Sequence, residues 1–264
     1  MSEATPAQAG TGAPSLLNVD LVPVPADRRD EAAYRDVVIV VDVLRTTTTL
    51  PILFDRGLEG VRLSPSLRVA RLCANDDGEL LIGERRGLPP EGFNHGNSPA
   101  TLQHHDFTGR RAVMVSENAP AVLPHVASAR RVVLASLVNA GAAVQDAARH
   151  AHERIDLVCC GFRGQADLDD LLTAGFLVDR LRRLRPDLEL AGAARMAQDL
   201  VHAEAEPLRL LWSSRTGRYL RRLGLERDLG VAADIDRSSV VPLLSEPQQR
   251  HGGTLFPFRP ADDD

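Results

Sequence analysis

The chain has 264 residues, of which 44% are hydrophobic and 25% charged, with 20 Gly and 17 Pro. These proportions are typical of globular proteins, and they exclude a collagen-like, mostly disordered or small disulfide-stapled chain. The net charge of −5, from 31 basic and 36 acidic residues, gives no overall attraction to nucleic acid or to anionic lipid. Lysine is absent from the sequence, which excludes Schiff-base chemistry and the usual Walker-type nucleotide site.

Cysteine content and hydropathy set the expected compartment and partners. The cysteines are Cys73, Cys159 and Cys160, an odd number with two adjacent, so we expect free thiols and a cytoplasmic protein. No apolar run is long enough to span a membrane. We therefore expect a small-molecule ligand and neither a nucleic acid nor a membrane as partner. The sequence is compatible with a homodimer.

The two ends of the chain differ in composition from the rest. Residues 1–15 are rich in Ala, Gly, Pro and Thr and lack the features of a signal peptide, so we expect a disordered segment there. We expect residues 16–250 to fold as one domain. The acidic end predicts a flexible tail over residues 251–264.

Short apolar runs alternate with helical patterns through the first two thirds of the chain. The runs predict strands over residues 36–43, 79–82, 111–115, 131–135 and 155–160. The helical patterns lie at residues 47–56, 66–74, 119–128, 139–154 and 168–184. This alternation favours an α/β class and a layered α/β/α fold with a mostly parallel or mixed sheet.

The last third has a different pattern. Helices are predicted over residues 191–203 and 208–222, and a late strand over 239–244. The sequence is also compatible with two related lobes, which would divide within residues 161–187.

Polar residues follow the first predicted strand, where α/β sheets bind their ligands. Asp42 is followed by Arg45 and then by four consecutive threonines that start at Thr46. The hydroxyls, the helix N-terminal amides and the guanidinium suit an anion, and Asp42 suits a hard cation. The alternative interpretation is a helix N-cap beside a structural Asp–Arg pair.

The other four predicted strands are also followed by small polar or acidic residues. These segments are residues 83–87 with the Gly-rich loop 92–99, residues 116–120, residues 136–140, and residues 161–164 with the acidic pair Asp169-Asp170. The Gly-rich loop has the alternative interpretation of an exposed connection. Five such strand ends at one sheet edge predict a pocket for a polar anion and an ion of the Mg²⁺ type.

Two other phosphatase mechanisms are excluded by spacing. A Cys-based phosphate loop needs an Arg six positions after its Cys, but Gln165 and Ala166 stand six positions after the paired cysteines. An aspartyl-phosphate enzyme needs a second Asp two positions after the first, and Leu44 is there instead. The pair Cys159-Cys160 is therefore predicted to belong to the core.

Five motifs together resemble one family. They are Asp42-Val-Leu-Arg-Thr-Thr-Thr-Thr, Gly83-Glu-Arg, Gly92-Phe-Asn-His-Gly-Asn-Ser-Pro, Ala135-Ser-Leu-Val-Asn-Ala and Asp169-Asp-Leu-Leu-Thr-Ala-Gly. In this order and spacing the chain resembles the 2-phosphosulfolactate phosphatase (ComB-like) family over residues 36–245. The resemblance implies an α/β fold of its own kind and a Mg²⁺-dependent phosphatase. It also implies hydrolysis of 2-phospho-3-sulfolactate to sulfolactate and phosphate, a step towards coenzyme M.

The resemblance and the chemistry of the residues give each site residue an expected role. We expect Mg²⁺ at Asp42, Glu84 and Asp170, since this ion takes few carboxylates and keeps several waters. The catalytic residues would be Asp42, Asp170 and, as general acid for the leaving alkoxide, Asp169. The expected substrate-binding residues are Arg45, Thr46, Thr47, Arg85, Asn97, Ser98, Asn118, Ser136 and Asn139.

The chain departs from the family pattern at three places. Residues 116–120 read Ser-Glu-Asn-Ala-Pro where the family has Thr-Thr-Asn-Gly-Thr, so Glu117 adds a carboxylate. Asn94 replaces an Asp, and Asp169 replaces a Glu. An added negative charge beside an anionic substrate would repel it. These departures leave open a non-catalytic or altered-specificity anion-binding homologue, and a phosphoryl transferase.

Overall fold

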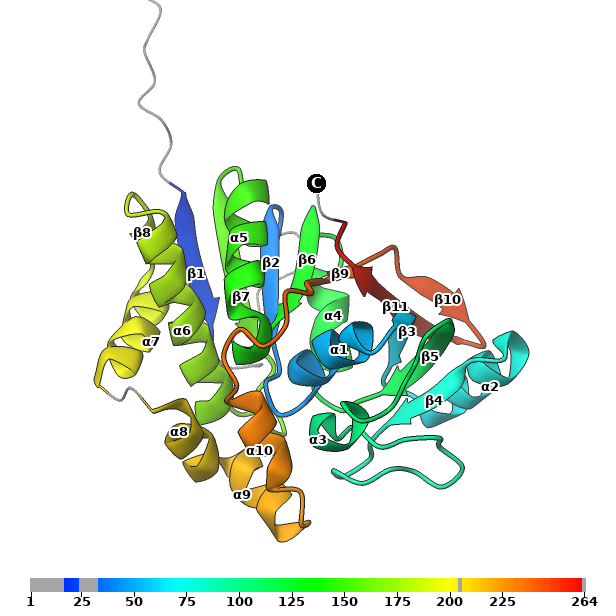
Figure 1. Cartoon of the computed structure of the whole chain (residues 1–264). Coiled ribbons are helices and arrows are strands. Elements are labelled where there is room, and N and C mark those ends of the chain that lie inside the picture. Colours follow the sequence, from blue (N-terminus) through cyan, green and yellow to red (C-terminus); the bar gives the residue numbers. More distant parts are fainter. Residues whose placement is uncertain (1–16, 24–32, 204–205, 263–264) are drawn as a thin grey trace, which may run out of the picture.

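A mixed sheet with helices on both faces forms the centre of the computed structural model, which describes residues 17–23, 33–203 and 206–262 (Figure 1). The predicted layered α/β/α class is confirmed. Its strands are β1 (Asn18–Val22), β2 (Val37–Val41), β3 (Leu58–Ser64), β4 (Leu80–Gly83), β5 (Arg110–Val115), β6 (Arg131–Ala135), β7 (Arg154–Cys159), β8 (Glu189–Leu190), β9 (Pro242–Leu244), β10 (Gln248–Arg250) and β11 (Gly253–Pro260).

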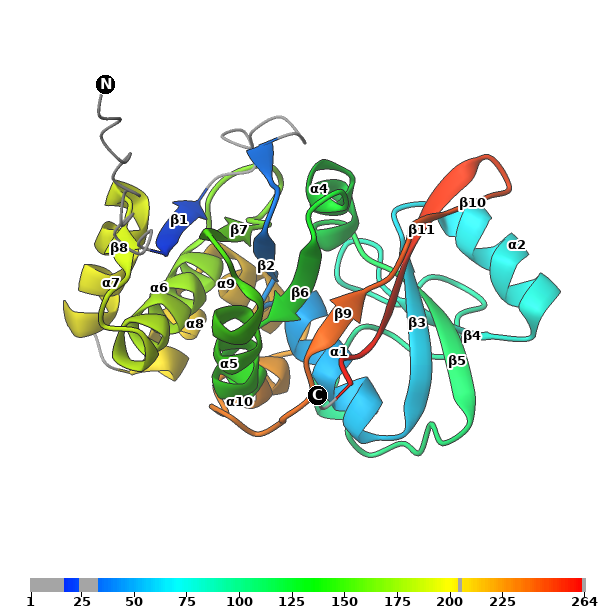
Figure 2. The ribbon, with the colours of Figure 1, turned by 90° about the horizontal axis from the view of Figure 1, so that it is seen from above.

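Two groups of parallel strands make up this sheet. The β2 group consists of β6, β2, β7, β1 and β8, and the β5 group consists of β3, β5 and β4. Strands β9 and β11 lie between the groups and join them through three antiparallel pairings, so the groups run in opposite directions (Figure 2). The polar loops after β2 and β5 nevertheless meet: the hydroxyls of Thr46 and Ser116 are 2.8 Å apart.

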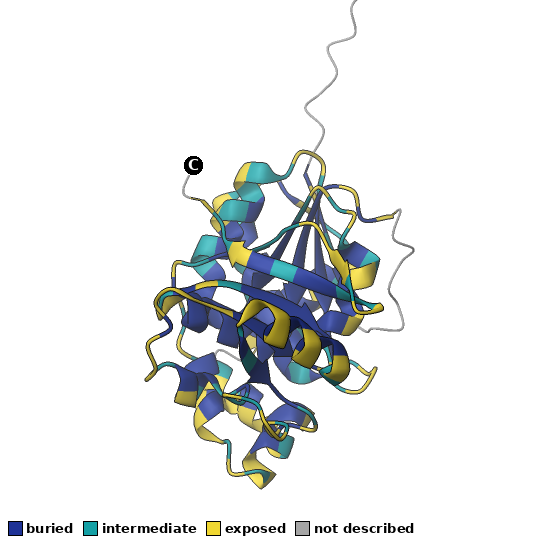
Figure 3. Cartoon of the chain, turned by 90° about the vertical axis from the view of Figure 1, so that its right-hand side faces the viewer, coloured by how far each residue is buried: buried dark blue, intermediate teal, exposed yellow. Residues whose placement is uncertain are grey.

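Strand β2 shows why the apolar runs are continuous. Val37, Ile39 and Val41 pack with one hydrophobic cluster, and Val38 and Val40 pack with another on the opposite face. Helices α5 (Ala140–His150) and α6 (Leu168–Leu184) cover the first face, whereas α1 (Thr46–Asp55) and α4 (Ala119–Val126) cover the second. The strands are correspondingly buried between helices (Figure 3). A strand that is covered on both faces has no polar alternation.

The remaining helices cover the ends and edges of the sheet. They are α2 (Leu67–Asp77), α3 (Pro99–Leu102), α7 (Gly192–Ala203), α8 (Pro207–Ser213), α9 (Arg215–Arg222), α10 (Arg227–Ala232) and a 3-10 turn at Leu137–Asn139. Helices α8 to α10 form a helical cap, in which Leu211, Leu220 and Leu229 share a core with Leu172 of α6. This cap lies below the carboxyl ends of the β2 group in Figure 1.

Four predictions about the chain's organisation need comment. The single helix predicted over residues 208–222 is wrong, because Ser214 separates α8 from α9 and its hydroxyl accepts a hydrogen bond from Gly217 N–H at 2.8 Å. The structure differs from the predicted flexible tail over residues 251–264, because β11 lies inside the sheet.

Helix α6 fills most of residues 161–187, where a division between lobes was expected. The predicted disordered segment, residues 1–15, lies outside the described residues.

Two further observations concern the helices and the cysteines. None of the helices that the structure describes is long and apolar enough to cross a membrane. The three cysteines are buried and form no disulfide. The adjacent pair, at the end of β7, lies in the core as predicted, and Cys160 also contributes to the wall of the cavity described below.

Candidate active site

A cavity of about 630 Å³ lies where the loops after β2, β4, β5 and β7 meet the helical cap. The β2 group contributes Asp42 and Arg45 to its wall, and the β5 group contributes Glu84 and Asn97. Tyr219 of α9 lines it from the cap. Four of the five predicted strand-end segments therefore contribute to the cavity wall, whereas residues 136–140 do not. The prediction assumed one sheet edge, but the structure brings together the ends of two opposed parallel groups.

Asp42 is the buried carboxylate of the β2 loop, with 2% of its surface exposed. Its Oδ2 accepts a hydrogen bond from Ala119 N–H at 3.3 Å. Burial raises the pKa of Asp42, while hydrogen bonds from the Thr46 and Asn118 side chains oppose the rise. Because the wall of the cavity includes this carboxylate, it can contact a bound ion or ligand.

Glu84 brings a second carboxylate to the cavity from the loop after β4. Its Oε2 accepts from Gly87 N–H at 2.6 Å, and its Oε1 accepts from Glu117 N–H at 3.2 Å. Burial raises the pKa of Glu84, and the charges of Glu117 and Asp42 raise it further. Asp42 and Glu84 are thus close enough to repel each other, and a cation between them would relieve that repulsion.

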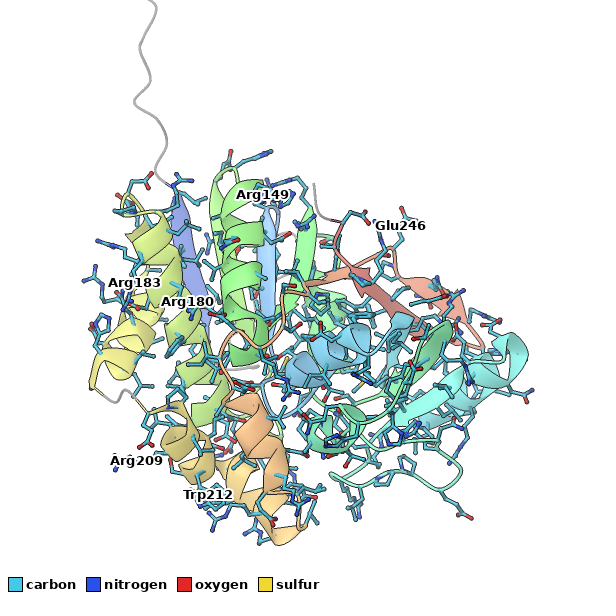
Figure 4. All side chains as sticks on the ribbon, viewed as in Figure 1. Arg149, Arg180, Arg183, Arg209, Trp212 and Glu246 are labelled. Carbon is cyan, nitrogen blue, oxygen red and sulfur yellow. The ribbon has the colours of Figure 1, made fainter. Side chains whose placement is uncertain are left out.

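Arg45 is a buried cation held in a fixed orientation. It is 5% exposed, its Nη1 forms an ion pair with Asp228 Oδ2 at 3.0 Å, and its Nη2 donates to Gly87 O at 2.8 Å. Asp228 also accepts hydrogen bonds from the Ser98 hydroxyl at 2.6 Å and from Ala100 N–H at 3.2 Å. Other arginines, such as Arg149 and Arg183, project outward from the helices (Figure 4).

The threonines after Arg45 serve the fold. Thr47 Oγ1 accepts from Asp42 N–H at 3.1 Å, and the Thr48 hydroxyl donates to Val43 O at 2.7 Å. Thr46 contacts Ser116, and the Thr47 amide donates to Asp42 O at 2.9 Å. These groups are buried and absent from the cavity wall, and the role of Thr46 and Thr47 in substrate binding stays a prediction.

The acidic pair at the start of α6 is also outside the cavity wall. Asp170 Oδ1 accepts from Val43 N–H at 2.9 Å and its Oδ2 from Gly161 N–H at 2.7 Å, so this carboxylate ties the loops after β2 and β7 together. Burial raises the pKa of Asp169 well above its ordinary value, and the charge of Asp170 raises it further. Asp169 Oδ1 has no hydrogen-bond partner among the described residues, and the expected roles of Asp170 as metal ligand and of Asp169 as general acid stay predictions.

Some of the other predicted binding residues line the cavity and others do not. Asn97 and Asn118 line the cavity, and the buried Asn97 Oδ1 has no hydrogen-bond partner among the described residues. Ser98 caps α3 by accepting from Thr101 N–H, and Asn139 Nδ2 donates to Leu134 O and Val240 O. Arg85, Ser98, Ser136 and Asn139 do not line the cavity, and their expected role in substrate binding stays a prediction.

The departures from the family pattern have local explanations. Arg85 Nη1 lies 3.3 Å from Glu117 Oε1, and the other oxygen of Glu117 accepts from Arg86 N–H at 3.3 Å. The added carboxylate is therefore engaged by neighbouring groups at the cavity wall. Asn94 is exposed, and its Oδ1 accepts from Leu81 N–H at 2.8 Å beside β4. Asn94 does not line the cavity, so no catalytic carboxylate is lost there.

Some residues of the site were missed in the sequence. Asp228 comes from the cap, far along the chain from Arg45, and no motif marked it. Arg86 and Arg163 line the cavity, whereas Arg85 was the predicted ligand. One signal was present in the sequence, since a Gly follows each of these two arginines. In the structure both arginines have left-handed backbones, with φ of 55° and 52°.

The oxygen atoms at the cavity wall are the candidate ligands of the expected Mg²⁺. Among the described residues, no three His, Cys, Asp or Glu side chains gather as a metal site. Mg²⁺ needs only one or two protein carboxylates, with waters and phosphate completing its shell. Asp42, Glu84 and the unpartnered Asn97 Oδ1 supply oxygen donors of the right kind. This donor set fits the ion.

Several known proteins that are similar to this chain carry one family name. The family model for 2-phosphosulpholactate phosphatase matches residues 23–247. A "probable 2-phosphosulfolactate phosphatase" of Thermus thermophilus is 38% identical over 229 residues, which cover 86% of this chain and 94% of that protein. Proteins with the same name are 37% identical in Deinococcus radiodurans (86% and 92% covered) and 34% identical in a Synechococcus strain (84% and 94% covered).

Proposed function

The chain belongs to the 2-phosphosulpholactate phosphatase family, and we propose that it hydrolyses 2-phospho-3-sulfolactate to sulfolactate and inorganic phosphate with the help of Mg²⁺. It would thus be a phosphoric monoester hydrolase. The observation that carries the proposal is the cavity itself, whose wall combines two buried carboxylates with a buried, oriented guanidinium. Such a combination suits a metal-bound phosphate.

Asp42 and Glu84 would hold the Mg²⁺, and the Asn97 side-chain oxygen would complete the protein ligands. When bound, the ion would neutralise phosphoryl oxygens and lower the pKa of a water molecule. The raised pKa values of the two carboxyl groups support this assignment, because their charges are unfavourable without a cation.

Arg45 would bind the phosphoryl group. Its guanidinium is buried and fixed by Asp228 and Gly87 O, so it does not need to reorganise when charge develops on the phosphoryl oxygens. Asn118 would orient Asp42 through its side-chain hydrogen bond. In the reaction a water oxygen attacks phosphorus, the ester P–O bond breaks, and the leaving alkoxide gains a proton.

The test is phosphate release from 2-phosphosulfolactate, measured with Mg²⁺, after exhaustive chelation, and after Mg²⁺ is restored. We expect turnover that chelation abolishes and Mg²⁺ recovers. Undiminished turnover after chelation would refute the role of the metal. If calorimetry detects sulfolactate binding but no phosphate is released under any condition, the chain is instead a non-catalytic anion-binding homologue.

A further inference from the structure

Two guanidinium groups at the cavity wall lack a neutralising partner. Arg86 and Arg163 are exposed and line the cavity, and neither forms an ion pair with any residue that the structure describes. The neighbouring arginines are different: Arg45 is paired with Asp228, and Arg85 with Glu117. The two unpaired charges are therefore available to an anion that enters the cavity.

Tyr219 of the helical cap connects the two arginine loops. Its hydroxyl donates to Arg86 O at 2.7 Å, and its ring centroid lies 5.5 Å from the Arg163 guanidinium carbon. The ring of Phe162 lies 5.0 Å from the same carbon. A guanidinium that rests on aromatic rings keeps its in-plane N–H groups free, and it is oriented before a ligand arrives.

The backbone supports the same arrangement in both loops. Arg86 and Arg163 adopt φ of 55° and 52°, and the glycine after each has φ of 81° or 79°. A left-handed conformation is uncommon for residues other than glycine, and such residues cluster at ligand sites. One loop follows a strand of the β5 group and the other follows a strand of the β2 group. The cavity wall thus has an equivalent arginine turn from each group.

The charges within the cavity are arranged unevenly. Asp42 and Glu84 are buried, whereas the two unpaired arginines are exposed. A second anionic group of a substrate would be repelled by the two carboxylates and attracted by the arginines. A phosphate ester with a second anion would therefore bind in one orientation, with its phosphate at Arg45.

We propose that Arg86 and Arg163 form a second anion subsite, which binds an anionic group of the substrate other than its phosphate, the sulfonate or the carboxylate, while the phosphate occupies the Asp42 and Arg45 end. This inference rests on the proposed function and adds the determinant of substrate class: esters with a second anionic group are preferred over simple phosphate monoesters. Tyr219 acts as a positioning residue for both arginines.

The experiment compares Arg86→Met and Arg163→Met with a control, Arg195→Met, which removes an exposed arginine from α7 outside the cavity wall. KM and kcat are measured at low salt with 2-phosphosulfolactate and with phenyl phosphate, which has no second anion. Sulfolactate binding is measured separately by calorimetry.

For each cavity variant we expect KM for 2-phosphosulfolactate to rise about tenfold, with kcat changed far less. The KM for phenyl phosphate should change much less than that, and sulfolactate should bind about tenfold more weakly. Arg163→Lys should recover only part of the loss, because an ammonium cannot make the bidentate contact. Equal changes for the two substrates, or no change beyond that of Arg195→Met, would overturn the subsite. Absence of turnover in the parent enzyme would instead refute the proposed function, and the calorimetric comparison would still test the subsite.

Discussion

Two segments of this chain carry buried aspartates after a strand but differ in what these side chains do. The loop after β2 carries Asp42, and the start of α6 carries Asp169 and Asp170 close after the end of β7. All three carboxylates are buried, and burial raises the pKa of each. Only Asp42 lines the cavity, whereas Asp170 uses both oxygens to accept backbone N–H groups. Position at a strand end therefore identifies the neighbourhood of a site, and the hydrogen bonds decide which carboxylates belong to it.

The largest effect is expected from removing the charge of Asp42 without changing its size. Asp42→Asn should lower kcat for 2-phosphosulfolactate about 10²–10³-fold, since the variant loses a proposed metal ligand. Its stability should not fall, because the buried charge is unfavourable in the folded state. Steady-state kinetics and urea unfolding measure the two effects. A variant that unfolds more easily and keeps its turnover would assign Asp42 a structural role.

The opposite result is expected at Asp170. Asp170→Ala would leave the buried N–H groups of Val43 and Gly161 without an acceptor, so the free energy of unfolding should fall by about 2–4 kcal/mol. Asp170→Asn keeps one acceptor oxygen and should lose less. Urea unfolding of the parent and both variants measures the three free energies of unfolding. Equal stability of all three proteins would show that Asp170 does not hold the two loops.

A smaller effect, dependent on pH, is expected at Asp169. Its pKa is raised by burial and by the Asp170 charge, so above the ordinary aspartate range, about pH 4, the folded state holds a proton that the unfolded state has lost. The free energy of unfolding contributed by this group therefore falls as pH rises from about 4 through the raised pKa. Asp169→Asn removes this dependence. The variant should exceed the parent in stability by about 1 kcal/mol or more near pH 7, and the difference should shrink towards pH 4.

Urea unfolding of both proteins across this pH range measures how the difference in their free energies of unfolding changes with pH. A difference that grows towards low pH would mean that the ionised carboxylate of Asp169 stabilises the fold.

The smallest effect is expected at Glu117, the carboxylate that departs from the family pattern. Its two oxygens contact Arg85 and the Arg86 amide, and the ion pair is largely exposed to solvent. Exposed pairs contribute little free energy. Glu117→Thr should therefore change kcat/KM for 2-phosphosulfolactate less than threefold, a factor that corresponds to about 0.6 kcal/mol. An increase of tenfold or more, confined to this substrate, would show that Glu117 repels the second anion.

Much of the fold could be predicted because its strands are continuous apolar runs. The alternation of Val37 to Val41 between two cores explains why β2 was clear in the sequence. Strand β11 could not be predicted so easily, since Pro257 and Pro260 disfavour a strand and one of its partners, β3, lies far away in the chain. The apolar side chains of Leu255, Phe256 and Phe258 are buried because they pack into two hydrophobic clusters of the folded protein.

Less of the site could be predicted, for a related physical reason. The residues around Asp42 and Arg45 were found from their place after a strand. The partner of Arg45, Asp228, could not be found, because only the folding of the cap onto α3 brings it close. The use of the threonines could not be decided from the sequence, because hydroxyl groups bind a neighbouring backbone as readily as an anion. Residue type alone does not distinguish these two uses.

The central proposal is that the metal and phosphate bind at Asp42 and not at the acidic start of α6. Its most direct test is electron paramagnetic resonance titration of Mn²⁺, as a probe for Mg²⁺, into the parent, Asp42→Asn and Asp169→Asn. The account predicts that the parent and Asp169→Asn bind Mn²⁺ with similar affinity, and that Asp42→Asn binds it at least tenfold more weakly, a loss of about 1.4 kcal/mol. Loss of Mn²⁺ binding in Asp169→Asn, with unchanged binding in Asp42→Asn, would contradict the account.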